Sequence, residues 1–462
     1  MQHFDLCVIG SGSGNTIVDE RFAEQKVAII DQGVGPGAVF GGTCLNLGCI
    51  PTKMFVLPAD YADSPEPAAR LGVDLAFRGA DWPAIRDRIF GRIDPIAAAG
   101  EEYRAHAPNV TLFRDHARFT GDRTLTVGEQ QLSADKIVIA AGSRATVPVI
   151  DGIEDVTVHT SDTVMRIDAL PKSVIIIGGG FIAAEFAHVF AAFGTEVTVV
   201  LRSAAMLRAE DADISARFTE LIGERVRILK QTTISGVRRR GESEADVVVS
   251  TEEYGDLDAD LLLVATGRRP NGDRLDVEAT GVKLDDGGRV VVDDYQQTTA
   301  PGIFALGDVS SPYQLKHVAN LEARVVQHNL LHPDSMITAD HRFVPHAVFS
   351  DPQVASVGLT EAQAKAAGRD YTAVIQDYGT VAYGWAMEDT RHFAKLIADR
   401  RSRQLIGAHI IGPQASTLIQ PLIQAMSFGV DAPQMARGQY WIHPALPELI
   451  ENALLSLDFG DR

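Results

Sequence analysis

Two copies of one local pattern constrain the fold of this 462-residue chain more than any other feature of its sequence. In each copy an apolar run enters a glycine-rich loop: FDLCVIG at 4–10 leads into GSGSGN, and SVIIIGGG at 173–180 leads into GGGFIA. Such runs are typical of parallel strands buried on both faces. A strand, a glycine-rich turn and a helical segment begin a dinucleotide-binding fold. We therefore expect an α/β protein with two Rossmann-like domains.

The second strand of each unit indicates which dinucleotide it binds. In the first copy KVAIID ends in Asp31, where a carboxylate accepts hydrogen bonds from a ribose. In the second copy the strand ends in apolar residues up to Leu201, and Arg202 and Arg208 follow. Guanidinium groups bind a 2′-phosphate, which a carboxylate would repel. The first copy thus predicts a dinucleotide without this phosphate and the second predicts NADPH, although two loop arginines can also be solvated surface residues.

Small residues at fixed places in the loops are the candidate cofactor contacts. The first glycine allows the tight turn, the second lets a pyrophosphate approach the backbone, and the third position governs packing of helix against strand. That third position is Asn15 in one copy and Ala183 in the other. Two further apolar strands within 136–144 and 261–271 end in similar turns and are expected to complete the two domains. The predicted contacts are Gly10, Gly12, Gly14, Gly142, Gly178, Gly180, Ala183 and Gly267.

The segment GGTCLNLGCIPTK at 41–53 places Cys44 and Cys49 five residues apart among glycines. Thiols at this spacing can close a small disulfide ring, and a helix N-terminus lowers the pKa of a thiol. The spacing therefore indicates a redox-active dithiol. Two structural cysteines or half of a metal site are the alternatives. No metal site is predicted, because Cys7 lies in an apolar strand and no histidine stands near the pair at a ligand spacing.

Charge and hydropathy narrow the class of partner. The chain has 42 basic and 61 acidic residues, a formal charge of −19, which disfavours nucleic acid and anionic membranes as partners. Its first apolar run is too short for a signal peptide, and no apolar stretch of about 18 residues could span a membrane. We expect about three domains with sizeable cores and a location in the reducing cytoplasm.

These motifs together resemble the pyridine nucleotide-disulfide reductases of the glutathione reductase and dihydrolipoamide dehydrogenase type. The resemblance also rests on ALGDV at 305–309 and IHPALPE at 442–448, and it covers essentially the whole chain. It implies a homodimer in which a C-terminal α+β domain forms the interface, with a strand and an amphipathic helix expected over 407–426. The implied order is an FAD domain at 1–155, an NADPH domain at 156–275, a return to the FAD domain at 276–335 and the interface domain at 336–462.

The resemblance implies roles at the cofactors. Lys53 and Glu185 would pair near the flavin and the nicotinamide, and Phe181 would act as a movable lid over the nicotinamide pocket. Taken without the resemblance, a surface lysine and a helical glutamate would be the default interpretation. Lys53 would also contact FAD, and the remaining implied contacts are Gly42, Thr43 and Asp308. The Asp308 carboxylate would bind a ribityl hydroxyl, although an isolated Gly-Asp pair is more often a turn.

The resemblance also implies roles in disulfide exchange. Cys49 would lie against the flavin as a thiolate, and Cys44 would attack the substrate disulfide. His443, oriented by Glu448, would protonate the departing thiolate, because an imidazole has a pKa near neutrality. In the family this histidine comes from the partner subunit, so a monomer is expected to be inactive.

The expected substrate is a low-molecular-weight disulfide. Mercuric reductase and the large thioredoxin reductases use an extra thiol pair near the C-terminus, and no cysteine follows Cys49 here. Dihydrolipoamide dehydrogenase prefers NAD and would have an acid at Leu201. Glutathione disulfide and mycothione remain, and GSGSGN and 436–455 resemble the branch of the family that reduces mycothione. A flavoprotein transhydrogenase, which needs neither the dithiol nor His443, and a non-catalytic binding protein are the alternatives outside this class.

Overall fold

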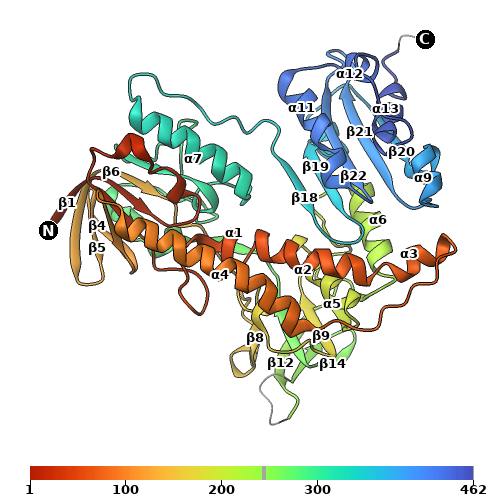
Figure 1. The fold of residues 1–462 in the computed structure, drawn as a ribbon, viewed down its shortest axis with the longest axis horizontal. Helices are drawn as coiled ribbons and strands as arrows, with labels where there is room; N and C mark the ends of the chain where they lie inside the picture. The colour runs from red at the N-terminus through yellow and green to blue at the C-terminus, as the bar shows by residue number, and fades with distance from the viewer. Residues whose placement is uncertain (242–245, 461–462) are drawn as a thin grey trace.

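The computed structural model describes residues 1–241 and 246–460, and Figure 1 shows three lobes around its larger sheets. The seven-stranded first sheet has the order β3-β2-β1-β6-β5-β4, and β17 also pairs with β6. Strands β4 and β5 form an antiparallel extension of a parallel core. The strands are β1 (Gln2–Ile9), β2 (Val27–Ile30), β3 (Val110–Phe113), β4 (Ala117–Gly121), β5 (Thr124–Val127), β6 (Gln130–Ile139) and β17 (Ile303–Ala305).

The second sheet is fully parallel and has the order β11-β10-β9-β15-β8. An antiparallel sheet of β12, β13 and β14 lies beside it, and β7 pairs with β16 between the first and second lobes. The strands are β7 (Ser143–Ala145), β8 (Val158–His159), β9 (Ser173–Ile177), β10 (Glu196–Val200), β11 (Arg227–Leu229), β12 (Ile234–Arg239), β13 (Val247–Thr251), β14 (Gly255–Ala259), β15 (Leu261–Val264) and β16 (Arg268–Pro270).

The third sheet is antiparallel with the order β18-β19-β22-β21-β20, and an extended segment joins its lobe to the end of α7 (Lys316–Leu331) (Figure 1). Short helices pack around it over their own apolar core. The strands are β18 (Pro345–Val348), β19 (Val354–Gly358), β20 (Tyr371–Asp377), β21 (Phe393–Asp399) and β22 (Leu405–Ile411), and the helices are α8 (Glu361–Ala366), α9 (Ala382–Ala386), α10 (Ala415–Leu418), α11 (Gln420–Phe428), α12 (Ala432–Arg437) and α13 (Pro447–Leu455).

The helices of the first two lobes share one apolar core. Phe55 of α2 stacks on Trp82 of α4 with ring centroids 4.8 Å apart, and Trp82 stacks on Phe190 of α5 at 6.0 Å. This aromatic core ties the first lobe to the second. No helix in the described parts of the chain is long and apolar enough to cross a membrane. The helices are α1 (Gly42–Asn46), α2 (Cys49–Ala62), α3 (Pro65–Arg70), α4 (Trp82–His106), α5 (Phe181–Ala192) and α6 (Ala212–Ile222).

The strand register gathers the predicted cofactor residues at one edge of the first sheet. Ile9 lies opposite both Ile30 and Ile139, so the residues that follow β1, β2 and β6 emerge side by side. Ala305 of β17 also lies opposite Ile139, which brings the 307–309 turn to the same edge. The predicted α/β class, with two Rossmann-like lobes and an α+β lobe, is confirmed. The domain boundaries stay predictions, and residues 242–245 and 461–462 of the predicted ranges lie outside the described residues.

Two local expectations differ from the structure. After the first glycine loop, the chain forms only the short 3-10 helices η1 (Gly14–Thr16) and η2 (Glu20–Phe22), where a helical segment like α5 was expected. Serine and asparagine side chains form hydrogen bonds to nearby backbone groups in non-helical conformations, and glycine loses much backbone entropy in a helix, so this stretch has a low helix propensity. The single helix expected within 407–426 is also divided into α10 and α11, because Pro421 near the start of α11 has no N–H to continue the hydrogen-bond ladder.

Candidate active site

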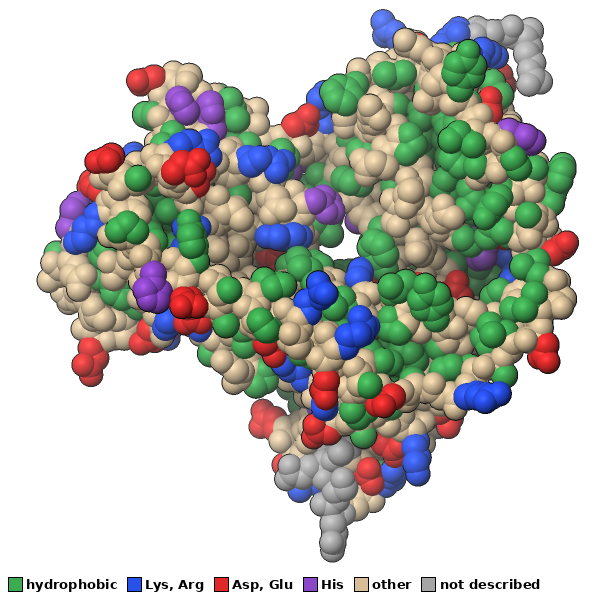
Figure 2. Space-filling model, viewed as in Figure 1, with side chains coloured by type: hydrophobic (Ala, Val, Ile, Leu, Met, Phe, Trp, Pro, Cys, Tyr) green, Lys and Arg blue, Asp and Glu red, His purple; other side chains and the backbone are tan. Residues whose placement is uncertain are grey.

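A cavity of about 1110 Å³ lies where the three lobes meet. In Figure 2 a hollow opens between the lobe of β18–β22 and the rest of the molecule, with basic and histidine side chains at its edge. Most of the predicted site residues line this cavity. They are Gly10, Gly12, Gly14, Asp31, Gly42, Thr43, Cys44, Cys49, Lys53, Gly142, Gly180, Phe181, Glu185, Arg208 and Asp308, whereas Gly178, Ala183, Arg202, Gly267, His443 and Glu448 do not line it.

The glycine loops leave room for a phosphate group. Gly10 has φ +111°, and a Cβ there would lie 2.2 Å from the Ala140 carbonyl oxygen, so only glycine fits this turn. At Gly12 a Cβ would meet only the Gly42 Cα at 3.8 Å, and at Gly180 it would meet nothing within 4 Å. Both glycines face the cavity, and their empty Cβ positions fit a pyrophosphate that approaches the backbone.

The packing role expected at the third loop position falls on another residue in the first copy. A Cβ on Gly14 would lie 2.5 Å from the Ala140 side chain and 3.2 Å from that of Val8 in β1. Gly14 therefore allows the close approach to the sheet, one residue before Asn15. In the second copy Ala183 is fully buried in α5 and fulfils the expected packing role.

The two thiols lie at the junction of α1 and α2, and Cys49 is the first residue of α2. Both are free thiols in this structure. The hydrogen bond from Cys44, reinforced by the Lys53 charge, lowers the pKa of Cys49 to about 7, although burial opposes this. The shared hydrogen bond and burial raise the pKa of Cys44, with a smaller opposing effect of Lys316. Near neutral pH the negative charge of the pair therefore resides on Cys49.

Lys53 and Glu185 form an ion pair that joins α2 to α5. Glu185 is buried, and its carboxylate also accepts a hydrogen bond from the backbone N–H of Phe349 at 3.0 Å. The Lys53 ammonium lies 4.5 Å from the centre of the Phe349 ring. These contacts hold a positive charge within reach of Cys49 at the floor of the cavity.

Asp31 lies buried at the end of β2, at the rim of the cavity. Its carboxylate accepts hydrogen bonds from the backbone N–H groups of Ser11 and Gly33, each at 3.1 Å, and pairs with Arg114 at 2.7 Å. Burial raises the pKa of this carboxyl, while the Ser11 and Arg114 contacts lower it. Asp31 therefore connects the glycine loop to β2, and Arg114 is a contact that the sequence did not predict.

Asp308 follows β17 in the short 3-10 helix η7 (Gly307–Val309). It accepts a hydrogen bond from the Ser143 hydroxyl at 2.6 Å, which also accepts one from Arg268 at 2.8 Å. The predicted contacts Gly142 and Gly267 lie at the two ends of this β7–β16 connection and have φ +68° and +124°. Asp308 is thus held beside the cavity by the link between the first two lobes.

The second glycine loop leads to the residues that were predicted to bind NADPH. Phe181 begins α5, is 50% exposed and lines the cavity, as a movable side chain requires. Leu201 follows β10 and is buried, so no carboxylate occupies that position. Arg202 and Arg208 are both exposed, but only Arg208 lines the cavity.

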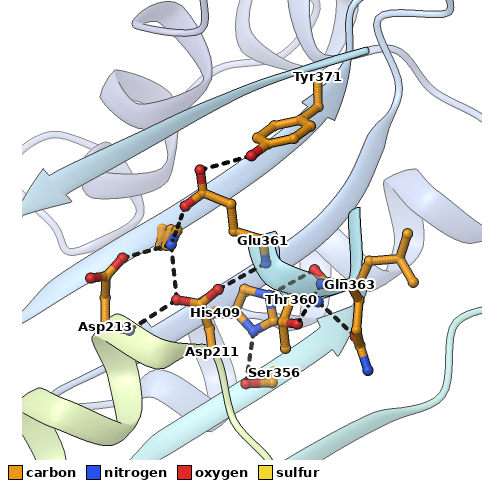
Figure 3. A network of polar contacts seen from close by, with 10 residues as sticks. Asp211, Asp213, Ser356, Thr360, Glu361, Gln363, Tyr371 and His409 are labelled. Carbon is orange, nitrogen blue, oxygen red and sulfur yellow. Dashed lines mark hydrogen bonds and ion pairs between the residues drawn. The ribbon is translucent and has the colours of Figure 1, made fainter. Parts of the chain in front are cut away.

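A network of polar contacts joins the loop after Arg208 to the third lobe (Figure 3). Glu210 accepts hydrogen bonds from His346 and the Ser356 hydroxyl, both at 2.6 Å. The adjacent Asp211 pairs with Lys395, which is only 3% exposed, at 2.9 Å. Lys395 also pairs with Asp213 and Glu361, each at 2.6 Å. The loop that carries Arg208 is therefore fixed to the third lobe.

His443 and Glu448 lie away from the cavity of their own chain. The His443 Nδ1 is 2.7 Å from a Glu448 carboxylate oxygen, and the His443 side chain is 70% exposed. The second carboxylate oxygen of Glu448 is buried and has no hydrogen-bond partner among the described residues. Within one chain, the pair thus has the predicted contact but does not reach the thiols' cavity.

Lys316 is a cavity residue that the sequence interpretation missed. It begins α7, and its ammonium donates a hydrogen bond to the Ser13 hydroxyl in the first glycine loop at 2.8 Å. Its charge also acts on Cys44. A single lysine before an amphipathic helix has no distinctive sequence signal, and only the fold brings it to this loop.

Comparison with known proteins agrees with this geometry. A family model described as pyridine nucleotide-disulphide oxidoreductase matches residues 4–323, and the dimerisation domain of the same family matches residues 344–454. Mycothione reductase from Mycobacterium tuberculosis is 54% identical over 99% of this chain and 100% of its own length. Mercuric reductase from Streptomyces lividans is 32% identical over 96% of this chain and 93% of its own.

A solved structure extends the likeness to the whole fold. The HOCl-induced flavoprotein disulfide reductase RclA from Escherichia coli, in a Cu(II) complex, superposes with a TM-score of 0.86. It is 29% identical, and the match covers 98% of this chain and 99% of that one. The family resemblance expected from the motifs is confirmed. The chain belongs to the pyridine nucleotide-disulphide oxidoreductases, flavoenzymes that use FAD and NAD(P)H.

Proposed function

We propose that this protein reduces mycothione to mycothiol with NADPH, through FAD and a redox-active Cys44–Cys49 pair. The observation that carries the choice of substrate is 54% identity over 99% of the chain to a mycothione reductase. The geometry supports the chemistry, because two free thiols with opposite pKa shifts face one large cavity. The first glycine loop, Asp31, Lys53 and Asp308 would hold FAD, which when bound would supply two-electron transfer between the nicotinamide and the disulfide.

The chain's residues support NADPH over NADH. Buried Leu201 leaves no acid at the end of β10, and the exposed guanidinium groups of Arg202 and Arg208 are free to turn toward a 2′-phosphate. Glu210 lines the same cavity as Arg208, but both of its carboxylate oxygens are engaged by His346 and Ser356.

The thiols carry out the exchange in two balanced steps. An imidazole takes the proton of Cys44, whose sulfur attacks one sulfur of the substrate disulfide and forms a mixed disulfide. The first substrate thiolate leaves and takes that proton from the imidazolium. The Cys49 thiolate then attacks the Cys44 sulfur, closes the Cys44–Cys49 disulfide and releases the second substrate molecule as a thiolate, which takes a proton from solvent. The substrate gains two electrons and the pair loses two. Because the pKa of Cys44 is raised, the first step needs a base as well as an acid.

We assign that proton transfer to the partner subunit's His443 in a homodimer. The His443–Glu448 pair is exposed and lies outside the cavity of its own chain, within the matched dimerisation domain. A second copy can bring the pair to the thiols, and the unpartnered oxygen of Glu448 offers a further hydrogen-bonding position. This arrangement requires two chains for each site. The cytoplasmic location stays a prediction.

A panel of acceptors tests the substrate. NADPH oxidation by the purified enzyme is followed with mycothione, glutathione disulfide and lipoamide at equal concentrations, together with a control that lacks an acceptor. We expect kcat/KM for mycothione to exceed the other two by at least about 100-fold, the scale of a site that hydrogen-bonds its own substrate. Faster turnover of glutathione disulfide would reject mycothione, and oxidation without any disulfide would reject the dithiol mechanism.

A further inference from the structure

The first glycine loop lacks the helix that usually follows such a loop. In the second copy α5 has 12 residues, whereas η1 and η2 in the first copy have three residues each. A regular helix offers its N-terminal N–H groups and macrodipole to a bound phosphate, and three residues supply little of either. The first loop therefore needs another source of order and of positive charge.

Arg104, near the end of α4, supplies contacts to this segment. Its Nε donates to the Asn15 side-chain oxygen at 2.7 Å, and its Nη2 donates to the carbonyl oxygens of Asn15 at 2.6 Å and Val18 at 2.9 Å. Arg104 is only 7% exposed. Its guanidinium thus replaces backbone hydrogen bonds that a continuous helix would have made.

The charge of Arg104 is not balanced by a contacting carboxylate. The three acceptors are neutral, and no ion pair in residues 1–241 and 246–460 includes Arg104. The Tyr103 ring centre lies 5.2 Å from the guanidinium carbon, and Asp19 acts on Arg104 from a distance but is itself paired with Arg21. Burial lowers the pKa of Arg104, yet a guanidinium keeps its proton in proteins. A buried cation is costly unless an anion compensates it.

Arg104 does not itself line the cavity, but it binds the loop that does. Asn15 directly follows residues 11–14, which line the cavity, and Lys316 donates to Ser13 from the other side of the same loop. The pyrophosphate of FAD would place negative charge at this loop. Gly14 has already taken over the packing against β1, so the third position was free to become asparagine and to bind Arg104.

We propose that Arg104 and Asn15 form a positioning pair for FAD: Arg104 fixes the glycine loop through Asn15 and supplies the positive charge that complements the pyrophosphate. The pair does not contact the reacting atoms. It acts on retention of the cofactor, and it accounts for the departure of GSGSGN from the usual third glycine.

Asn15→Asp gives the sharpest test, because it preserves the shape and the hydrogen bond to Arg104 but adds a competing negative charge. We expect holoenzyme with Asn15→Asp to release FAD about 10-fold faster on dilution, measured by the rise in FAD fluorescence, without a loss of melting temperature. A purely structural contact predicts equal or slower release, since the new ion pair would stabilise the segment. Wild-type release from Asn15→Asp would overturn the proposal.

Arg104 variants provide the complementary arm. Arg104→Met is expected to release FAD at least about 10-fold faster, Arg104→Lys less so, and the exposed Arg92→Met on the same helix at the wild-type rate. At saturating FAD, the ³¹P resonances of the bound pyrophosphate should shift in Arg104→Met. Unshifted resonances with a lower melting temperature would reduce Arg104 to a packing role and overturn the proposal. If Arg104→Met does not fold, Asn15→Asp and Arg104→Lys still decide it.

Discussion

Replacing Cys44 by alanine should raise the pKa of Cys49, whereas replacing it by serine should not. In the structure the hydrogen bond from the Cys44 thiol is the largest cause that lowers the pKa of Cys49 to about 7, and the Lys53 charge adds to it. Cys44→Ala removes the donor, while Cys44→Ser keeps an O–H donor at the same place. The two variants therefore differ in one hydrogen bond to the thiolate.

The size of the effect follows from that bond. A hydrogen bond to a charged group contributes about 1.5–3 kcal/mol, and one pKa unit corresponds to about 1.4 kcal/mol, which sets an upper limit of about two pH units. We expect the midpoint of Cys49 ionisation in Cys44→Ala to rise by about one pH unit, because Lys53 still acts on it.

The assay is a pH titration of the long-wavelength charge-transfer absorption that a thiolate gives against an oxidised flavin. Both variants have a single thiol at the site. Burial raises the pKa of the remaining Cys7 to about 12, so Cys7 stays protonated during the titration and does not contribute to the absorption. Absorption should grow as pH rises through about 7 in Cys44→Ser and through about 8 in Cys44→Ala. Equal midpoints would refute the hydrogen-bond argument, and absorption that persists in Cys49→Ser would reverse the roles of the two thiols.

Three further changes test other parts of the site. Replacing both Arg202 and Arg208 by glutamine should weaken NADPH about 10- to 100-fold more than NADH in steady-state KM, and equal losses would show that neither arginine binds the phosphate. His443→Ala should leave flavin reduction by NADPH intact but slow disulfide turnover about 100-fold in stopped flow. A heterodimer of Cys44→Ser and His443→Ala chains should recover up to half of the wild-type activity, because one of its two sites is intact. An inactive heterodimer would show that the site lies within one chain. Lys395→Met should lower the free energy of unfolding in urea by about 3 kcal/mol, because the Asp211 carboxylate stays buried without its partner, and a wild-type midpoint would contradict this.

The features predicted from the sequence are those that depend on neighbours along the chain. Apolar runs such as 173–177 predicted the parallel strands, because a strand buried on both faces shows no alternation of polar and apolar residues. The loop glycines and the cysteine spacing predicted a cofactor cradle and a dithiol because each needs only a few consecutive residues. Pro421 is likewise a local signal, because a proline interrupts the helical hydrogen-bond ladder within 407–426.

The features that were missed depend on residues brought together by the fold. Lys316 and Arg104, from two helices, reach Ser13 and Asn15, and Arg114, directly after β3, reaches Asp31. No local pattern connects these residues to their partners. Each brings a cation to a loop that is expected to hold an anionic cofactor, in a chain whose formal charge is −19. Overall charge therefore says little about the site, because a few basic side chains placed by tertiary structure determine its local field. Asn15 is the one sign of such a contact in the sequence. It replaces the usual third glycine of the loop motif, and the structure explains this replacement by its hydrogen bond with Arg104.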